Sequence, residues 1–281
     1  MRLVTIESFP APRAAMLRDG RVLDIWGEAF SSVREEDRSI YALLQGGLLA
    51  EVEAVEEDGV PVEEVPLLAP IARPGKIVCI GLNYRTHAEE AGIDPPETPT
   101  FFAKYANAIA GPGAEVALPS TSKKVDYEAE VAFVVGDRCK DVSEEEALNH
   151  VAGYMLLNDL SARDLQFSTP QWMPGKVFDG SAPCGPALVT PDEAGPHDAI
   201  EIELTLNGEV MQSASTADLI HSVPALVSHL SGLMTLDPGD IVATGTPSGV
   251  GVAREPRVWL KPGDEVVVSS PQLGELKTTI A

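Results

Sequence analysis

The run from Asp126 to Gly136 contains two glutamates, separated by one residue, that could bind a metal ion. In this run carboxylates are followed by apolar side chains. If this run forms a β-strand, its period of two places Glu128 and Glu130 on the same face. Two negative charges at that separation repel each other in a partly dry site unless one is protonated or a cation lies between them. A divalent cation is the simpler solution.

A third carboxylate, Asp159, follows the apolar segment 153–158, which is typical of a short buried strand. It would precede a helix that we expect to begin with a capping box of Ser161 and Asp164. Three carboxylates without paired histidines or cysteines form an all-oxygen ligand set, which favours Mg²⁺, Mn²⁺ or Ca²⁺ over zinc or copper. In a chain this acidic, the alternative for Glu-x-Glu is a solvated strand face.

A histidine and a glutamate stand three residues apart in the segment 85–91. If this segment forms a helical turn, His87 and Glu90 share one face, whereas Glu89 points away. A carboxylate beside an imidazole raises its basicity and fixes its tautomer, as in a general base with its orienting partner. Taken alone, His87 fits a surface histidine of an acidic helix at least as well.

Five segments, in their order and spacing, resemble the fumarylacetoacetate hydrolase family. They are residues 81–90 (GLNYRTHAEE), 126–136 (DYEAEVAFVVG), 158–166 (NDLSARDLQ), 175–186 (beginning GKVFD and ending CGP) and 244–251 (TGTPSGVG). The resemblance covers residues 70–281. It implies a mixed β-roll catalytic domain, a metal ion held by Glu128, Glu130 and Asp159, and 2-oxo acid chemistry.

The resemblance also implies roles for residues around the metal. The segment that holds His87 would be a lid that orders over bound substrate, with His87 and Glu90 positioning an attacking water. Lys176 would lie beside the metal and the substrate. A cation there is also expected because three carboxylates around a dication leave a local charge of about −1, to which an anionic 2-oxo acid would add.

Four further residues are weaker candidates for the substrate site. Gln166 could donate a hydrogen bond to a substrate oxygen, and Lys104 could line the pocket. Arg163 could contact the substrate or equally pair with a structural carboxylate. The stretch 245–251 lacks the Gly-Lys-Ser/Thr ending of a P-loop, so its backbone N–H groups and the Thr246 hydroxyl could hold a substrate carboxylate. The alternative for this stretch is a plain tight turn.

These residues predict hydrolysis of a carbon–carbon bond in a 2,4-dioxo acid of the acylpyruvate type. Water activated by His87 would attack the distal carbonyl, and the dication would stabilise the enolate that leaves. Oxaloacetate decarboxylation and isomerisation of 2-hydroxyhepta-2,4-diene-1,7-dioate use the same enolate, and the sequence does not choose among the three.

A Ca²⁺-stabilised binding protein is a non-catalytic alternative. A serine hydrolase is disfavoured because no Gly-x-Ser-x-Gly motif is present.

Composition restricts the partners and the compartment. The net charge of −23 over 281 residues disfavours nucleic acid and anionic membranes, which would repel the protein. The three cysteines form no Cys-x-x-Cys pair, as expected of free thiols in a reducing cytoplasm. The N-terminus lacks the apolar core of a signal peptide, and no apolar run reaches 18 residues. We therefore expect a cytoplasmic protein, and the family resemblance adds a homodimer.

The patterning predicts a β-rich α+β protein of two domains. Residues 3–9 and 13–26 resemble strands with a hairpin turn at Asp19-Gly20. Residues 38–57 are predicted to form one helix, or two that are separated at Gly46-Gly47. Prolines and glutamates in 58–75 suit a linker. This places a small N-terminal α/β domain at residues 1–70 and the catalytic domain at 71–281, with a buried strand at 76–81.

Overall fold

A computed structural model describes residues 1–27, 30–55 and 58–281. Its helices are α1 (Ile40–Gly46), α2 (Leu49–Glu53), α3 (Arg85–Ala91), α4 (Arg163–Gln166), α5 (Pro191–Ala194) and α6 (Val223–Leu233). Its strands are β1 (Arg2–Ile6), β2 (Arg13–Arg18), β3 (Arg21–Leu23), β4 (Val60–Pro61), β5 (Leu67–Leu68), β6 (Ile77–Gly81), β7 (Thr100–Lys104), β8 (Ile109–Ala110), β9 (Glu115–Val116), β10 (Val125–Asp126), β11 (Ala129–Val135), β12 (Val151–Asn158), β13 (Ser161–Ala162), β14 (Ala182–Val189), β15 (Glu201–Leu206), β16 (Glu209–Ser215), β17 (Ile241–Ala243), β18 (Glu265–Ser270) and β19 (Gly274–Ile280). The predicted β-rich α+β fold is confirmed.

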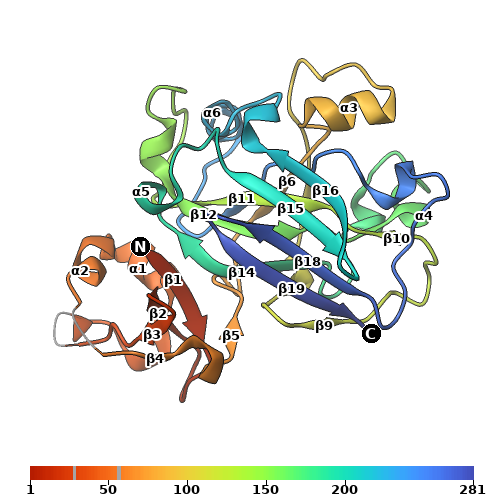
Figure 1. The fold of residues 1–281 in the computed structure, drawn as a ribbon. Helices are drawn as coiled ribbons and strands as arrows, with labels where there is room; N and C mark the ends of the chain where they lie inside the picture. The colour runs from red at the N-terminus through yellow and green to blue at the C-terminus, as the bar shows by residue number, and fades with distance from the viewer. Residues whose placement is uncertain (28–29, 56–57) are drawn as a thin grey trace.

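Two sheets form the body of the protein (Figure 1). The larger has twelve strands, with the central order β1-β14-β12-β11-β17-β6-β7, and the smaller has the order β16-β15-β18-β19-β9. Strands β11 and β12 of the larger sheet lie against β15 and β18 of the smaller one. Because β11 and β12 are covered on both faces, every residue in them is buried and their sequences are almost continuously apolar.

The N-terminal strands belong to the larger sheet, because β1 pairs antiparallel with β14. The predicted hairpin is confirmed: Asp19 and Gly20 have φ values of 50° and 72°, the positive values that a type I′ turn requires. The second helical alternative is also confirmed, since α1 and α2 are separated at Gly47, which has a φ of 64°. Residues 56–57 of the predicted helix lie outside the described residues. The division near residue 70 stays a prediction.

Two local predictions near the carboxylates are wrong. The run from Asp126 is not one strand, because β10 ends at Asp126 and β11 begins at Ala129. At this break, the N–H groups of Glu128 and of Ala129, the first residue of β11, donate to side-chain oxygens of Asn158 and Gln212 at 3.1 and 2.9 Å, instead of to a neighbouring strand.

The predicted capping box is also absent. Ser161 pairs in β13 with Asp126, and its hydroxyl donates to the carbonyl of Asp159 at 2.8 Å, so it does not cap α4. The carboxylate of Asp164 accepts hydrogen bonds from the hydroxyl of Ser122 and the N–H of Lys123.

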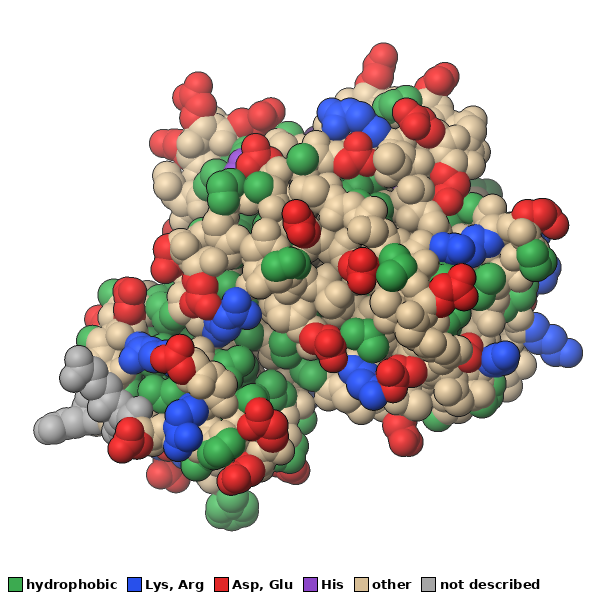
Figure 2. All heavy atoms as spheres, viewed as in Figure 1, with side chains coloured by type: hydrophobic (Ala, Val, Ile, Leu, Met, Phe, Trp, Pro, Cys, Tyr) green, Lys and Arg blue, Asp and Glu red, His purple; other side chains and the backbone are tan. Residues whose placement is uncertain are grey.

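Charged side chains are scattered on one face of the molecule (Figure 2). On the face shown in Figure 2, Asp and Glu side chains are spread over the whole molecule, with fewer Lys and Arg side chains between them. No helix of the described residues combines the length and the apolar character needed to span a membrane.

The close approach of β12 to β14 predicts the effect of Gly153→Ala. A Cβ atom at Gly153 would lie 2.3 Å from the carbonyl oxygen of Val189, so one strand must move. We expect a loss of about 1–3 kcal/mol in the free energy of unfolding, which lowers the Tm by about 2–4 °C per kcal/mol. Gly232→Ala, in α6 with no atom within 4 Å of its added Cβ, is the control and should be neutral or slightly stabilising. Equal Tm values for both variants would contradict this packing.

Candidate active site

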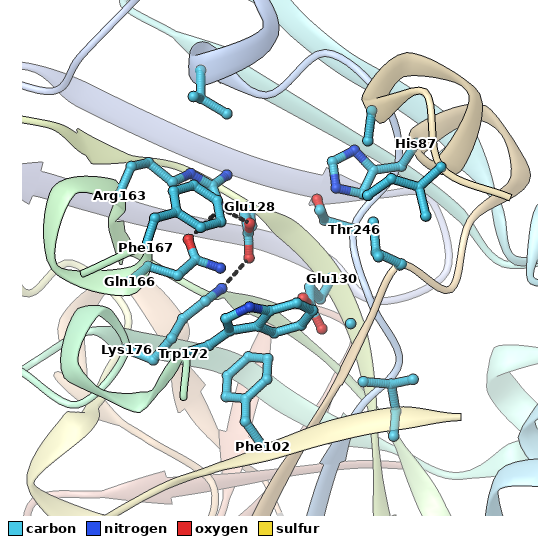
Figure 3. Close-up of a pocket in the computed structure, with 16 residues that line it drawn as sticks. His87, Phe102, Glu128, Glu130, Arg163, Gln166, Phe167, Trp172, Lys176 and Thr246 are labelled. Carbon is cyan, nitrogen blue, oxygen red and sulfur yellow. Dashed lines mark hydrogen bonds and ion pairs between the residues drawn. The ribbon is translucent and has the colours of Figure 1, made fainter. Parts of the chain in front are cut away.

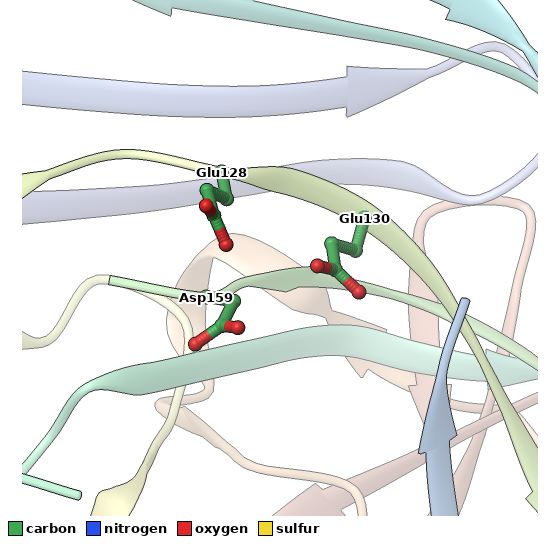
Figure 4. Close-up of side chains that lie close together, drawn as sticks. All are labelled: Glu128, Glu130 and Asp159. Atoms are coloured by element: carbon green, nitrogen blue, oxygen red, sulfur yellow. The ribbon is translucent and has the colours of Figure 1, made fainter. Parts of the chain in front are cut away.

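The three carboxylates singled out in the sequence lie together. Glu128, Glu130 and Asp159 each offer one oxygen, and these oxygens lie within 4.8 Å of one another (Figure 4). All three residues are buried. One divalent cation with Mg²⁺, Mn²⁺ or Ca²⁺ to oxygen distances of about 2.0–2.6 Å can bridge ligands at this separation. Their proximity is therefore a finding, and their role as metal ligands stays a prediction.

Strand pairing accounts for this proximity. Glu130 is the second residue of β11, and Asp159 follows directly after β12, the antiparallel neighbour of β11. The N–H group of Asp159 donates to the carbonyl of Glu128 at 2.9 Å. The start of one strand and the end of the next thus bring residues about thirty positions apart to one place, as predicted for Asp159.

Two buried lysines contact the carboxylates. Lys176 Nζ lies 2.6 Å from Glu128 Oε2 and 2.8 Å from Asp159 Oδ2. Lys104 Nζ, at the end of β7, lies 2.6 Å from Asp159 Oδ1 and also donates to the carbonyl of Lys176. The predicted position of Lys176 beside the candidate ligands agrees with these contacts. The prediction that Lys104 lines the pocket is wrong, because its side chain is buried against Asp159 and does not reach the cavity.

Arg163 is paired with protein carboxylates rather than left free. Its Nη1 atom lies 2.7 Å from Glu128 Oε1, and its Nε atom donates to Asp126 Oδ2 at 2.9 Å. Its Nη1 also donates to Gln166 Oε1 at 3.0 Å. These contacts favour the predicted alternative, in which Arg163 pairs with structural carboxylates. Because Gln166 Oε1 is engaged, the Gln166 amide keeps N–H donors for the cavity, and its hydrogen bond to substrate stays a prediction.

Asp126 is a fourth buried carboxylate that sequence reasoning missed as a site residue, although it begins the run that drew attention. We call Asp126, Glu128, Glu130 and Asp159 the carboxylate cluster, and Lys104, Arg163 and Lys176 the buried cations. With every group ionised, the four carboxylates and three cations leave a formal charge of −1. A bound dication would change this charge to +1, which suits an anionic substrate.

The glycine loop, residues 245–251, serves protein carboxylates. Its N–H groups donate as follows: Gly245 to Glu130 Oε2 at 2.8 Å, Gly249 to Glu90 Oε1 at 2.8 Å, and Gly251 to Asp126 Oδ1 at 2.7 Å. The N–H groups of Gly245, Gly249 and Gly251 are therefore not left for a substrate carboxylate, and contact of the loop's other N–H groups with substrate stays a prediction. The Thr246 hydroxyl does line the cavity, and its contact with substrate stays a prediction.

The electrostatics of the two glutamates differ because their partners differ. Burial alone would raise the pKa of Glu128, but Arg163 and Lys176 hold it well below its ordinary value. Burial and the negative charges of Asp159 and Glu128 raise the pKa of Glu130 well above its ordinary value. Across the part of the chain that the structure describes, no cationic side chain forms an ion pair with Glu130. A divalent ion would supply this missing positive charge, so the residues fit a metal site.

A cavity of about 160 Å³ opens over the carboxylates (Figure 3). Its wall is largely apolar and includes Ile80, Ile93, Phe102, Phe167 and Trp172. This volume is below the roughly 300–1,000 Å³ of sites for drug-sized ligands. The cavity therefore suits a small molecule with one charged end at the carboxylates and a less polar remainder.

His87 lies on α3, across the cavity from Lys176 in the view of Figure 3. Its Nδ1 atom is 3.1 Å from Glu90 Oε2, which confirms the predicted pairing on one helical face. Because the other oxygen of Glu90 accepts the N–H of Gly249, the carboxylate is held from both sides. With Nδ1–H donated to Glu90, Nε2 carries the lone pair of a base. Its catalytic role stays a prediction.

Sequence reasoning missed one residue with no local signal. Gln212, buried on β16, accepts a hydrogen bond from the N–H of Ala129 and donates to Thr246 Oγ1 at 2.8 Å. The aromatic wall of Phe102 and Trp172, whose ring centroids are 5.9 Å apart, was missed as well. Both features join segments far apart in the chain, and a single sequence gives no indication of that.

Comparison with known proteins gives a consistent result. The family model described as fumarylacetoacetate (FAA) hydrolase C-terminal matches residues 76–281. The mitochondrial oxaloacetate tautomerase FAHD2A of Bos taurus is 46% identical over 217 residues, which are 76% of this chain and 69% of that protein.

Two solved structures resemble the whole chain. A Mycobacterium smegmatis protein designated HpcE has a TM-score of 0.90 and 34% identity, covering 100% of this chain and 99% of its own. The maleylpyruvate hydrolase of Sphingobium sp. SYK-6, solved with manganese(II) and pyruvate, has a TM-score of 0.84 and 28% identity, with the same coverage.

Because no cationic side chain of the described structure forms an ion pair with Glu130, Glu130→Gln should affect thermal stability differently with and without metal. Without metal, the variant should be at least as stable as the wild type, because it removes a buried carboxylate repelled by two others. With Mn²⁺ at 100 times its Kd, the wild type should gain about 2.7 kcal/mol, and the variant should gain little. Thermal unfolding with and without Mn²⁺ measures both effects, with the exposed Glu145→Gln as control. A full Mn²⁺ effect in Glu130→Gln would contradict the site.

The position of Lys104 predicts that Lys104→Met tightens metal binding. The change removes a positive charge 2.6 Å from Asp159, so the site would attract a dication more strongly, by about tenfold in Kd or about 1.4 kcal/mol. Calorimetric titration with Mn²⁺ measures the change. Lys76→Met, whose lysine pairs with Asp237 and Asp240 instead, is the control and should not alter Kd. Weaker Mn²⁺ binding in Lys104→Met would show that Lys104 mainly orients Asp159.

Proposed function

Because this chain belongs to the fumarylacetoacetate hydrolase family, we propose that it is an enzyme that interconverts the keto and enol forms of a small 2-oxo acid, with oxaloacetate as the main substrate. The observation that carries the proposal is one small cavity lined both by candidate metal ligands and by an oriented histidine. The similarity to an oxaloacetate tautomerase supports the choice of substrate.

The residues divide the chemistry between them. A Mg²⁺ or Mn²⁺ ion held by Glu128, Glu130 and Asp159 would supply Lewis-acid stabilisation of negative charge on the 2-oxo group. His87 Nε2 accepts the proton from C3, and Glu90 stabilises the imidazolium that results. The His87 imidazolium returns this proton to the 2-oxo oxygen, which completes the enol and restores the neutral imidazole, and the reverse transfers restore the ketone.

The charge of the site favours this reaction. Removing a proton from C3 leaves negative charge on the substrate, and the buried cations with a dication stabilise such charge in a place that water does not screen. Lys176 contributes most directly, since its Nζ lies between Glu128 and Asp159 and its side chain lines the cavity.

Hydrolysis of an acylpyruvate is the second candidate. It is supported by the aromatic wall of Phe102 and Trp172 and by the nearby Phe167, which together could hold an apolar acyl group. In this reaction His87 would activate water rather than take a proton from C3. The cytoplasmic location and the homodimer expected from the sequence also remain proposals.

Proton exchange at C3 tests the proposed function directly. Wild-type protein with Mg²⁺ or Mn²⁺ in D₂O should replace the C3 protons of pyruvate and oxaloacetate with deuterium faster than the metal ion alone, as measured by proton NMR. In parallel samples that contain an acylpyruvate, loss of its absorbance would report hydrolysis. No exchange and no cleavage with any 2-oxo acid would refute the proposal, whereas cleavage without faster ketone–enol exchange would favour the second candidate.

His87→Ala should lower the exchange rate constant by about 10²–10⁴-fold, the usual contribution of a positioned general base. Glu90→Gln should lower it less, because the imidazole remains but loses the carboxylate that stabilises its charged form. His150→Ala is the control, since His150 pairs with Asp137 and does not line the cavity. Mn²⁺ affinity should stay the same in all three variants. An unchanged rate in His87→Ala would exclude the histidine as the base.

A further inference from the structure

A buried carboxamide joins the candidate metal strand to the glycine loop. Gln212, on β16, is 2% exposed and makes three hydrogen bonds. Its Oε1 accepts the N–H of Ala129 at 2.9 Å, while its Nε2 donates to Thr246 Oγ1 at 2.8 Å and to the Pro247 carbonyl at 2.9 Å. Three segments that are distant in the sequence therefore meet at one amide.

The partners fix which way the Gln212 amide points. The N–H of Ala129 can only donate and must face Oε1, while the carbonyl of Pro247 can only accept and must face Nε2. If the amide were flipped, its N–H group would face the N–H of Ala129 and its oxygen would face the carbonyl oxygen of Pro247, so neither hydrogen bond could form. Consequently the group that faces Thr246 Oγ1 is an N–H donor.

This orientation determines the polarity of the Thr246 hydroxyl. A hydroxyl has one proton and two lone pairs, and one lone pair of Thr246 Oγ1 is taken by Gln212. Within residues 1–27, 30–55 and 58–281, this hydroxyl donates to no protein acceptor. Since Thr246 lines the cavity, its proton is left for a ligand oxygen.

We propose that Gln212 is a positioning residue that makes Thr246 a hydrogen-bond donor to an anionic oxygen of the substrate, its carboxylate in particular. The proposal rests on the proposed function, because it takes the substrate to be a 2-oxo acid. Gln166 is set in the same way, since its Oε1 accepts from Arg163 and its amide protons remain. In Figure 3, Gln166 and Thr246 lie on opposite sides of Glu128, so N–H and O–H donors flank the candidate metal position.

Donors at these places suit the substrate better than acceptors. A 2-oxo acid brings only oxygen acceptors to this end of the cavity, and the carboxylate cluster already supplies acceptors to the cation. A Thr246 oxygen presenting lone pairs would repel the substrate carboxylate, whereas its proton forms a charge-assisted hydrogen bond. Gln212 therefore acts on substrate affinity through Thr246, without contacting the substrate.

Gln212→Glu tests the proposal because, at nearly constant size, it reverses the hydrogen bond to Thr246, although it also removes the N–H group that donates to the Pro247 carbonyl. A carboxylate can still accept the N–H of Ala129, but it also accepts the Thr246 proton and so turns the lone pairs toward the cavity. We expect the KM for the 2-oxo acid and the Kd for pyruvate with Mn²⁺ to rise at least tenfold. The Mn²⁺ affinity without substrate should not fall, because a carboxylate added near the candidate ligands attracts a dication, and kcat should fall less than KM rises.

A double-mutant cycle separates this role from a structural one. Thr246→Val should raise KM and the pyruvate Kd by a similar factor, and adding Gln212→Glu to it should raise them no further, because the hydroxyl is already absent. Thr246→Ser should restore most of the affinity. If Gln212→Glu does not fold, as judged by circular dichroism, Gln212→Met replaces it and should show a smaller increase that also vanishes with Thr246→Val.

The outcomes are distinct. Additive effects of Gln212→Glu and Thr246→Val, or an unchanged pyruvate Kd in Thr246→Val, would overturn the inference while leaving the proposed function intact. A loss of Mn²⁺ affinity equal to the loss of pyruvate affinity in Gln212→Glu would also overturn it, because Gln212 would then act through the metal strand. A wild-type protein that binds no pyruvate with Mn²⁺ and exchanges no C3 protons would instead refute the proposed function.

Discussion

The burial of four carboxylates in one place is the constraint on which the site depends. A carboxylate out of water is stable only when cations or N–H groups compensate for the lost hydration. The carboxylate cluster has such compensation at each member: the buried cations contact three of its residues, and N–H groups of the glycine loop reach Asp126 and Glu130. Glu130 receives only the N–H group of Gly245 in the described structure, and this is where a dication would be most stabilising.

Paired strands hold Glu130 and Asp159 in place, and the glycine loop supplies the N–H groups that, with the buried cations, compensate the negative charge. Glu130 and Asp159 are attached to two paired strands that are buried along their whole length, so their positions are fixed by the core. The glycine loop then wraps around them and can bring its backbone close because it carries little side-chain bulk. A Cβ at Gly251, for example, would lie 2.2 Å from the carbonyl oxygen of Val258 and 2.6 Å from Asp126 Oδ1. This position therefore requires glycine.

Part of this arrangement could be predicted from the sequence, and the reason is local spacing. The pairing of His87 with Glu90 follows from three-residue helical spacing, and the place of Asp159 follows from the end of an apolar strand. The strand break between Asp126 and Ala129 could not be predicted, because its cause is two side chains from elsewhere in the chain, Asn158 and Gln212.

The same limit applies to the compensating groups. The use of glycine-loop N–H groups for protein carboxylates was not predicted either, since a glycine-rich stretch looks the same whether it faces a ligand or a buried acid. The β-rich fold and the proximity of the three candidate ligands were predicted correctly. The groups that neutralise those ligands were not, because charge compensation depends on contacts between distant segments.

The charge count also explains why one architecture suits several reactions of 2-oxo acids. Tautomerisation, decarboxylation and carbon–carbon hydrolysis all place negative charge on the oxygen at C2, and the same set of cations stabilises that charge in each. The groups that would differ in their contribution are others that line the cavity: under the proposed function His87 would exchange a C3 proton and in the second candidate it would activate water, while the aromatic wall would admit or exclude a larger acyl group. Because stabilisation and selection are carried by different residues, reaction type can change at the wall and the histidine while the carboxylate cluster stays the same.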